Sequence, residues 1–178
     1  MKDMGVPKCF LGINLKIDKR NGTIFLCQEE YTKTILSRFN MAECNPHNTP
    51  MVTRQVHNKS SVQIKNTKTN NNISERIPFR EAIGSLMYLA NGTRPDIAYS
   101  VNFLARKQHE PTQENWLEVK RIFRYLKGNT SLGLKYKSIK NGLEAFSDAS
   151  FRDCDDSTST AGYVINLFGD TISWRSHK

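Results

Sequence analysis

The stretch that decides the C-terminal fold is AFSDAS, residues 145–150, in which Asp148 is the only acid. Apolar side chains recur at every second position around it (Leu143, Ala145, Ala149, Phe151), which is the pattern of a β-strand. Two further strand-like runs follow at 160–168 and 170–175. The loop between AFSDAS and the run at 160–168 holds Asp153, Asp155 and Asp156. From this pattern alone, Asp148 is either a polar residue on the wet face of an edge strand or a candidate catalytic carboxylate.

The residues upstream of this stretch predict a mixed architecture. Residues 9–17 and 23–28, joined by Asn21-Gly22, indicate a β-hairpin, and 28–41 has the spacing of a helix. Three more helical patterns begin near Phe79, Pro95 and Pro111, and a sixth strand-like run covers 132–137. Because the last four strand-like runs are joined by short turns, we expect them to form one antiparallel meander. The fold class is therefore α+β.

The apolar positions of the helical patterns identify the expected core. The first of the three helices after the linker buries Phe79, Ile83, Leu86 and Ala90, and the second buries Ile97, Val101 and Leu104. The third buries Trp116, Val119, Phe123 and Leu126, and its opposite side carries Lys120, Arg121, Arg124 and Lys127. This basic side predicts contact with a nucleic acid, although an ordinary solvated helix face has the same composition.

The net charge of +9 is unevenly distributed. Residues 51–140 hold 16 Lys and Arg against 6 Asp and Glu, whereas residues 141–178 hold 3 against 6. Clustered basic residues attract phosphate backbones, so this middle segment favours a polyanionic partner. Neither a membrane span nor a signal peptide is evident, and we expect an intracellular protein that is not secreted and has no membrane partner.

Residues 53–76 are rich in Asn, Lys, Ser and Thr and have few large apolar side chains, which indicates a polar linker. The prolines of NPHNTP (45–50) end the preceding helix. We therefore divide the chain into residues 1–44, a linker at 45–78, a helical region at 79–131 and a C-terminal strand region at 132–178.

Nine short motifs, in order over nearly the whole chain, resemble the Pol polyprotein of copia-type long-terminal-repeat retrotransposons. They are FLGI (10–13), CQEEY (27–31), FNM (39–41), IGSLMYL (83–89), TRPDI (93–97), RYLKG (124–128), SDAS (147–150), STSTAGY (157–163) and ISW (172–174). The sequence departs from the family at Ser150 and Phe151, where Asp and Trp are usual, and near Ser157, where Arg is usual.

This resemblance implies a role for each segment. Residues 1–44 would be the C-terminal end of a reverse transcriptase palm with the first thumb helix, and 79–131 the helical thumb and connection region. Residues 132–178 would be the truncated N-terminal part of a ribonuclease H-like domain, whose first three antiparallel strands they contain. The parent enzyme would copy RNA into DNA and cleave RNA–DNA hybrids, and its partners would be hybrid or template–primer duplexes, with no small-molecule cofactor.

By the same resemblance, Asp148 is the first metal-binding carboxylate of the ribonuclease H site. Two Mg²⁺ ions in such a site need several carboxylates, and the family's other ligands lie beyond Lys178. We therefore expect Mg²⁺ in the intact parent, no tight metal binding by these 178 residues, and no activity from them alone. The alternative function is that of a domesticated or decayed remnant that acts at most as a basic nucleic-acid-binding module. The alternative for Asp148 is a polar residue on the wet face of an edge strand.

Overall fold

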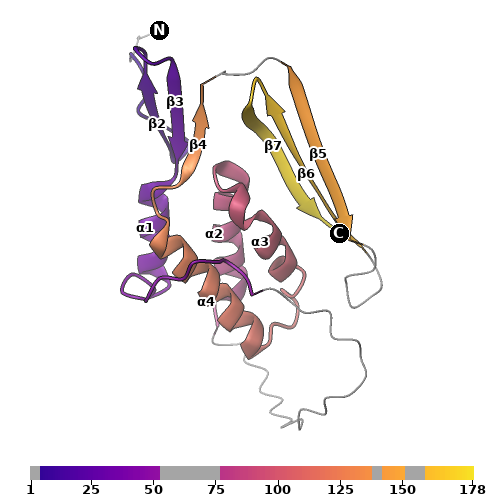
Figure 1. Cartoon of the computed structure of the whole chain (residues 1–178). Helices are drawn as coiled ribbons and strands as arrows, with labels where there is room; N and C mark the ends of the chain where they lie inside the picture. The colour runs from indigo at the N-terminus through magenta and orange to yellow at the C-terminus, as the bar shows by residue number, and fades with distance from the viewer. Residues whose placement is uncertain (1–4, 53–76, 138–141, 151–158) are drawn as a thin grey trace.

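The structure is a computed structural model that describes residues 5–52, 77–137, 142–150 and 159–178. It is an α+β fold in which a helical centre lies beside two separate antiparallel sheets (Figure 1). The sheet orders are β1-β2-β3-β4 and β5-β6-β7. The polar linker expected at 53–76 and the acids of the 151–158 loop lie outside the described residues.

The N-terminal sheet begins with the predicted hairpin, formed by β2 (Ile13–Asp18) and β3 (Thr23–Cys27). The expected single strand at 9–17 is wrong, because the chain reverses at Leu11 and Gly12, whose φ angles are 48° and 74°. Few residues other than glycine adopt such angles, so the reversal separates the short strand β1 (Cys9–Phe10) from β2.

The fourth strand of this sheet, β4 (Gly133–Tyr136), corrects the expected four-stranded meander. It pairs with β3, with Leu134 opposite Leu26, and not with the strands that follow it in the chain. A side chain at Gly133 would collide with the carbonyl oxygen of Leu26, so only glycine permits this close approach. The chain thus returns from its last helix to the sheet where it began.

The helical centre consists of α1 (Glu29–Arg38), α2 (Phe79–Gly92), the 3₁₀ turn η1 (Pro95–Ile97), α3 (Ala98–Ala105) and α4 (Gln113–Gly128). The eleven core residues predicted for the three later helices are all at most 9% exposed. Thr112 accepts from the backbone N–H of Asn115, whose side chain accepts from the N–H of Thr112, and this capping box fixes the start of α4. The periodicity therefore located the core correctly.

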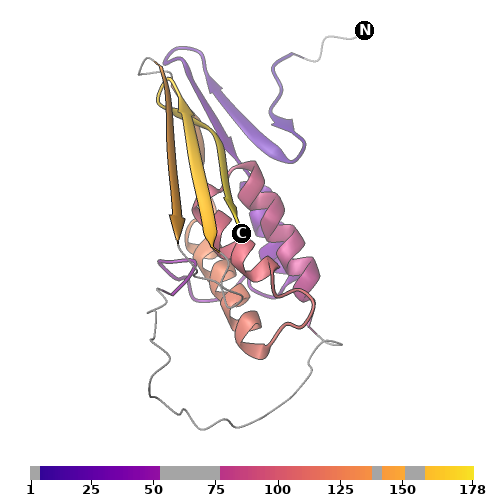
Figure 2. The ribbon, with the colours of Figure 1, turned by 90° about the vertical axis from the view of Figure 1, so that its right-hand side faces the viewer.

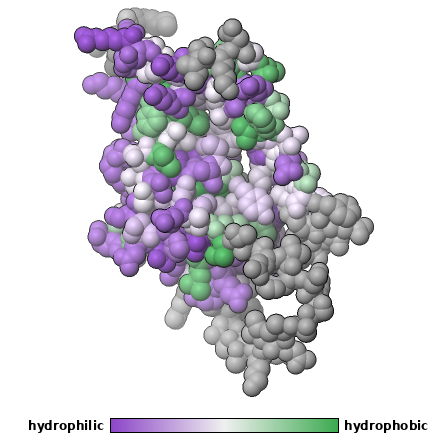
Figure 3. Space-filling view, viewed as in Figure 1, coloured by the Kyte–Doolittle hydropathy of each residue, from purple (hydrophilic) through white to green (hydrophobic). Residues whose placement is uncertain are grey.

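The C-terminal sheet contains β5 (Leu143–Ser150), β6 (Thr160–Leu167) and β7 (Asp170–His177) in an antiparallel meander, as expected for these three strands. It runs alongside the helices in both views (Figures 1 and 2). Its upper part carries apolar side chains at the surface (Figure 3), including Leu143, Leu167 and Phe168.

Hydrogen bonds between described residues attach this sheet to the rest of the molecule. The indole N–H of Trp174 donates to the carbonyl oxygen of Ala90 in α2 at 2.8 Å. Tyr136 at the end of β4 donates to the carbonyl oxygen of Thr171 at 3.0 Å, and Arg106 after α3 donates to the hydroxyl of Thr160 at 3.3 Å. These hydrogen bonds are polar links, whereas the helices share an apolar core of buried residues to which the described part of this sheet contributes none. None of the described helices is long and apolar enough to cross a membrane.

Candidate functional site

Asp148 lies in the middle of β5, opposite Gly162 of β6, and its side chain is exposed. One carboxylate oxygen accepts the backbone N–H of Ala149 at 2.9 Å. Side chains alternate along a strand, so Asp148 shares a sheet face with Phe146 and Ser150. These positions border the space between the sheet and α3, together with Tyr99. Asp148 therefore faces a groove within the molecule.

Among the described residues, Asp148 belongs to no cluster of acids, histidines or cysteines large enough to form a metal site. No group of three or more His, Cys, Asp or Glu side chains in the described ranges is arranged to bind an ion. A Mg²⁺ site needs several oxygen ligands from protein, water or substrate. The donor set around Asp148 does not fit a two-metal centre by itself.

The basic side of α4 was the second candidate site, and its four cationic residues are all partly buried. The ammonium of Lys120 lies 5.8 Å from the ring centre of Trp116, within cation–π range. Arg121 and Arg124 hydrogen-bond to the segment that follows α1. The sequence predicted the position of these residues on one side of α4, but it gave no sign of this internal partner.

That segment, residues 45–49, lies along α4 and is called the strap below. The guanidinium of Arg124 donates to the carbonyl oxygen of Asn45 at 2.7 Å, and the N–H of His47 donates to the carbonyl oxygen of Arg124 at 3.1 Å. Arg121 contacts the His47 ring nitrogen Nε2 at 3.2 Å and donates to the hydroxyl of Thr49 at 2.8 Å. Part of the hydrogen-bonding capacity of the two arginines is thus used inside the fold.

The surroundings of His47 favour its neutral form. Burial lowers the pKa of His47 below its usual value, and the positive charges of Arg121 and Arg124 lower it further. A neutral imidazole can accept from Arg121 through Nε2, whereas an imidazolium cannot. The contact between Arg121 and the imidazole therefore requires an unprotonated His47.

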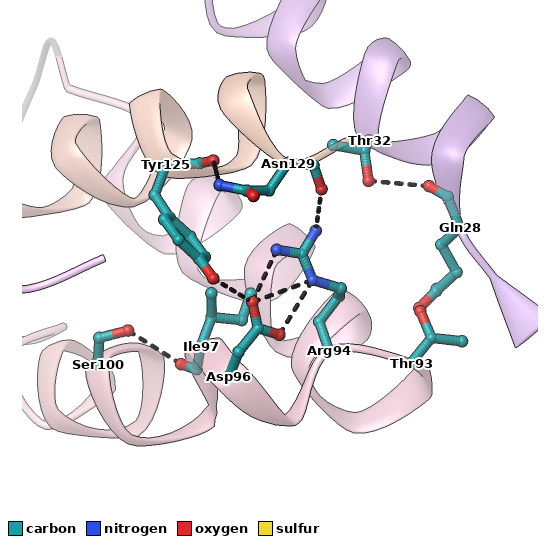
Figure 4. Close-up of polar contacts among 9 residues, drawn as sticks. All are labelled: Gln28, Thr32, Thr93, Arg94, Asp96, Ile97, Ser100, Tyr125 and Asn129. Carbon is teal, nitrogen blue, oxygen red and sulfur yellow. Dashed lines mark hydrogen bonds and ion pairs between the residues drawn. The ribbon is translucent and has the colours of Figure 1, made fainter. Parts of the chain in front are cut away.

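A buried arginine, Arg94, is the centre of the most extensive polar cluster in the described residues (Figure 4). Its guanidinium contacts both carboxylate oxygens of Asp96, with distances of 2.7 to 3.2 Å, and donates to the carbonyl oxygen of Asn129 at 2.8 Å. The hydroxyl of Tyr125 donates to the same carboxylate at 2.8 Å. Arg94 and Asp96 therefore form an ion pair, with 2.7 Å between the closest nitrogen and oxygen.

The electrostatics of this cluster keep Asp96 ionised. Burial opposes the charged form, but the hydrogen bonds and charge of Arg94, with the Tyr125 hydroxyl, outweigh it and lower the pKa of Asp96. Burial together with Asp96 raises the pKa of Tyr125. Since Arg94 is only 1% exposed, the cluster joins η1 to the end of α4 from within and is structural.

A second buried contact ties α1 to the same region (Figure 4). The Gln28 side-chain oxygen accepts from the hydroxyl of Thr93 at 2.9 Å, and the Gln28 carbonyl accepts from the hydroxyl of Thr32 at 2.8 Å. A side chain at Gly92 would meet the Gln28 amide at 2.5 to 3.0 Å. The sequence did not predict this contact between Gln28 and Thr93. The two residues belong to the motifs CQEEY and TRPDI and are 65 residues apart in the chain.

Comparison with known proteins identifies the family. The chain is 35% identical over 177 residues to the retrovirus-related Pol polyprotein from transposon TNT 1-94 of Nicotiana tabacum, and 39% identical over 171 residues to that from transposon RE2 of Arabidopsis thaliana. It is also 33% identical over 180 residues to an uncharacterized mitochondrial protein of Arabidopsis thaliana. The chain belongs to the family of retrovirus-related Pol polyproteins of copia-type transposons, as its motifs predicted.

The lengths covered differ widely between these relatives. The match to the tobacco polyprotein includes 99% of this chain but 13% of the relative, and the match to the RE2 polyprotein includes 95% of this chain but 11% of the relative. The match to the mitochondrial protein includes 100% of this chain and 70% of the relative. The chain thus corresponds to a small part of the two transposon polyproteins and to most of the mitochondrial protein. No family model and no solved structure matches it.

Proposed function

We propose that these 178 residues are a segment of a transposon polyprotein whose parent is an RNA-directed DNA polymerase that also cleaves the RNA of RNA–DNA hybrids. The observation that supports this most is the position of Asp148, a carboxylate in the middle of the first strand of a three-stranded antiparallel meander. The similarity to Pol polyproteins over nearly the whole chain supports the same assignment.

Within this proposal, the N-terminal hairpin with α1 is the end of the reverse transcriptase palm and the first thumb helix. The region from α2 to α4 is the thumb and connection region, which contacts hybrid or template–primer duplex. Strands β5 to β7 are the start of the ribonuclease H-like domain. The shared core of α1, α2, α3 and α4 supports treating the helical part as one unit.

Asp148 would be the first ligand of the Mg²⁺ ions of the parent enzyme. In the assembled site, the metal would supply charge stabilisation at the scissile phosphate, and Asp148 would contribute one negatively charged oxygen ligand. The described residues do not supply the other carboxylates, so we propose that this segment has no nuclease activity by itself.

A chimeric polyprotein tests this function. The homologous segment of the tobacco transposon polyprotein is replaced by these 178 residues, and Mg²⁺-dependent cleavage of a labelled RNA–DNA hybrid is measured. We expect cleavage by the chimera and none by the 178 residues alone. A correctly folded chimera without hybrid cleavage would contradict the nuclease assignment, and Mg²⁺-dependent cleavage by the isolated segment would contradict its inactivity.

The alternative, a basic nucleic-acid-binding module, is favoured by the net charge of +9 and by the basic side of α4. Arg121 and Arg124 hydrogen-bond to the strap, which reduces what they can offer to phosphates. Salt-dependent binding of a hybrid duplex that is weakened by exchanging Lys120 and Lys127 for Gln would support this module. Unchanged binding in that variant would remove α4 as its site.

A further inference from the structure

The groove between α3 and the C-terminal sheet is lined by apolar, aromatic and polar side chains whose arrangement the nuclease assignment does not explain. Two adjoining hollows of about 310 and 360 Å³ share Tyr99, Asp148, Gly162 and Ser176. Each is in the range of small-ligand pockets in proteins. Figures 1 and 2 both show the sheet alongside the helices that form the other wall.

Two neighbouring cross-strand rows of residues form the sheet side of the groove, and the first is apolar whereas the second is polar. One row across the three strands is Phe146, Val164 and Trp174, which are paired in the sheet register. The next row is Asp148, Gly162 and Ser176. Because Gly162 has no side chain, the Asp148 carboxylate stands beside a hollow bordered by an apolar row.

Aromatic faces on both sides of the groove are accessible to solvent. Tyr99 of α3 is 45% exposed and Phe146 of β5 is 59% exposed. Trp174 is held in place by its hydrogen bond to Ala90. Stacking on such rings stabilises the binding of flat heterocyclic bases regardless of their identity.

The carboxylate of Asp148 allows the groove to distinguish between the bases. An ionised carboxylate only accepts hydrogen bonds, so it favours a base whose exposed edge carries adjacent N–H donors. Guanine, with its ring N–H and amino group on the Watson–Crick edge, fits this requirement, and that edge is exposed only when the base is unpaired. The net charge of +9 favours a ligand that carries phosphates.

We propose that this groove binds an unpaired guanine of a single-stranded nucleic acid, with the base stacked against Tyr99 and Phe146 and its donor edge on the carboxylate of Asp148. This role needs no metal and no residue outside the described ranges. It is separate from the nuclease proposal, because base binding is measured in EDTA and hybrid cleavage in Mg²⁺.

The test is fluorescence anisotropy in EDTA with two labelled octamers, one of thymidines only and one with a single central guanosine. We expect the guanosine octamer to bind at least about tenfold more tightly, as a bidentate contact to a base implies. Asp148→Asn should abolish this preference, and Tyr99→Ala, at an exposed position, should weaken binding of both octamers. Glu144→Gln, an acid on the same face of β5, is the matched control and should keep the preference.

Equal affinity for the two octamers would overturn the proposal, and so would a preference for guanosine that survives Asp148→Asn. Competition by free guanosine monophosphate should displace the guanosine octamer, whereas cytidine monophosphate should not. A chimera that cleaves hybrids while the segment ignores guanine would refute only the present inference, so the two proposals fail separately.

Discussion

The guanidinium of Arg94 donates to the backbone carbonyl oxygen of Asn129, 35 residues away, at 2.8 Å. Asn129 directly follows α4, so this bond fixes the position where the chain leaves the helices for β4. Arg94 also forms the ion pair with Asp96, whose carboxylate accepts from Tyr125 of α4. One buried side chain thus links the start of α3 to the end of α4.

Replacing Arg94 by Met should destabilise the fold strongly. The exchange leaves Asp96 without its cation and the Asn129 carbonyl without its donor, and breaking such a buried pair costs about 3–5 kcal/mol. Urea unfolding followed by circular dichroism measures the loss. Lys19→Ala, at an exposed position, should change the free energy of unfolding by less than about 0.5 kcal/mol. Equal stability of Arg94→Met and the unchanged chain would show that the cluster is dispensable.

The strap should make stability depend on pH below neutrality. The fold lowers the pKa of His47 below its usual 6.5, so the folded state binds fewer protons than the unfolded chain in this range. The contribution is therefore fully present above pH 6.5 and is lost as the pH falls towards the lowered pKa. We expect the free energy of unfolding to fall between pH 7.5 and 5.5, and less so in His47→Gln. A His47→Gln chain with the same pH profile would disprove the role of His47.

Two glycines should respond to alanine in opposite directions. Gly133→Ala places a methyl group against the Leu26 carbonyl oxygen, which is backbone and cannot move aside, so β4 should separate from β3. Gly84→Ala, on the exposed face of α2 with no atom within 4 Å, should stabilise by about 0.5–1 kcal/mol. Thermal unfolding of both variants checks this. The account of β4 fails if Gly133→Ala is as stable as the unchanged chain.

The C-terminal sheet should be the part that opens most readily. Its attachment through Trp174, Tyr136 and Arg106 is polar, and Phe146 and Leu143 remain exposed. Trp174→Phe removes the bond to Ala90, and we expect a loss of about 1 kcal/mol with faster hydrogen exchange in β5–β7 than in α2 and α4. Uniform exchange across sheet and helices would indicate that the sheet and helices unfold as one unit.

Sequence periodicity predicted the helices well because each buries one face in a shared core, as Ile83 and Val119 do. Strand pairing was harder, since the pattern of residues 133–136 is the same whichever neighbour it joins. The close approach at Gly133 decided that it pairs with β3. The strap was missed for a similar reason: Arg121 and Arg124 have the composition of a solvated face, and only the folded chain brings His47 to them.

Asp148 was the most informative residue of the sequence, and the structure places it in β5 with the predicted strand partners. Among the described residues, no group of three or more acids, histidines or cysteines is arranged to hold a metal ion with it. The groove it faces was not predicted, since that groove depends on how the sheet lies against α3.

The most direct test of the central claim compares Asp148→Asn with Glu144→Gln in the chimeric polyprotein. The two acids lie four residues apart on the same face of β5, so each exchange removes one charge from the same surface. The rate of Mg²⁺-dependent hybrid cleavage is measured for each, with primer extension on an RNA template as the control for folding. We predict that Asp148→Asn abolishes cleavage while Glu144→Gln retains it and both still extend the primer. Full cleavage by the Asp148→Asn chimera would contradict the assignment of Asp148 to the nuclease site.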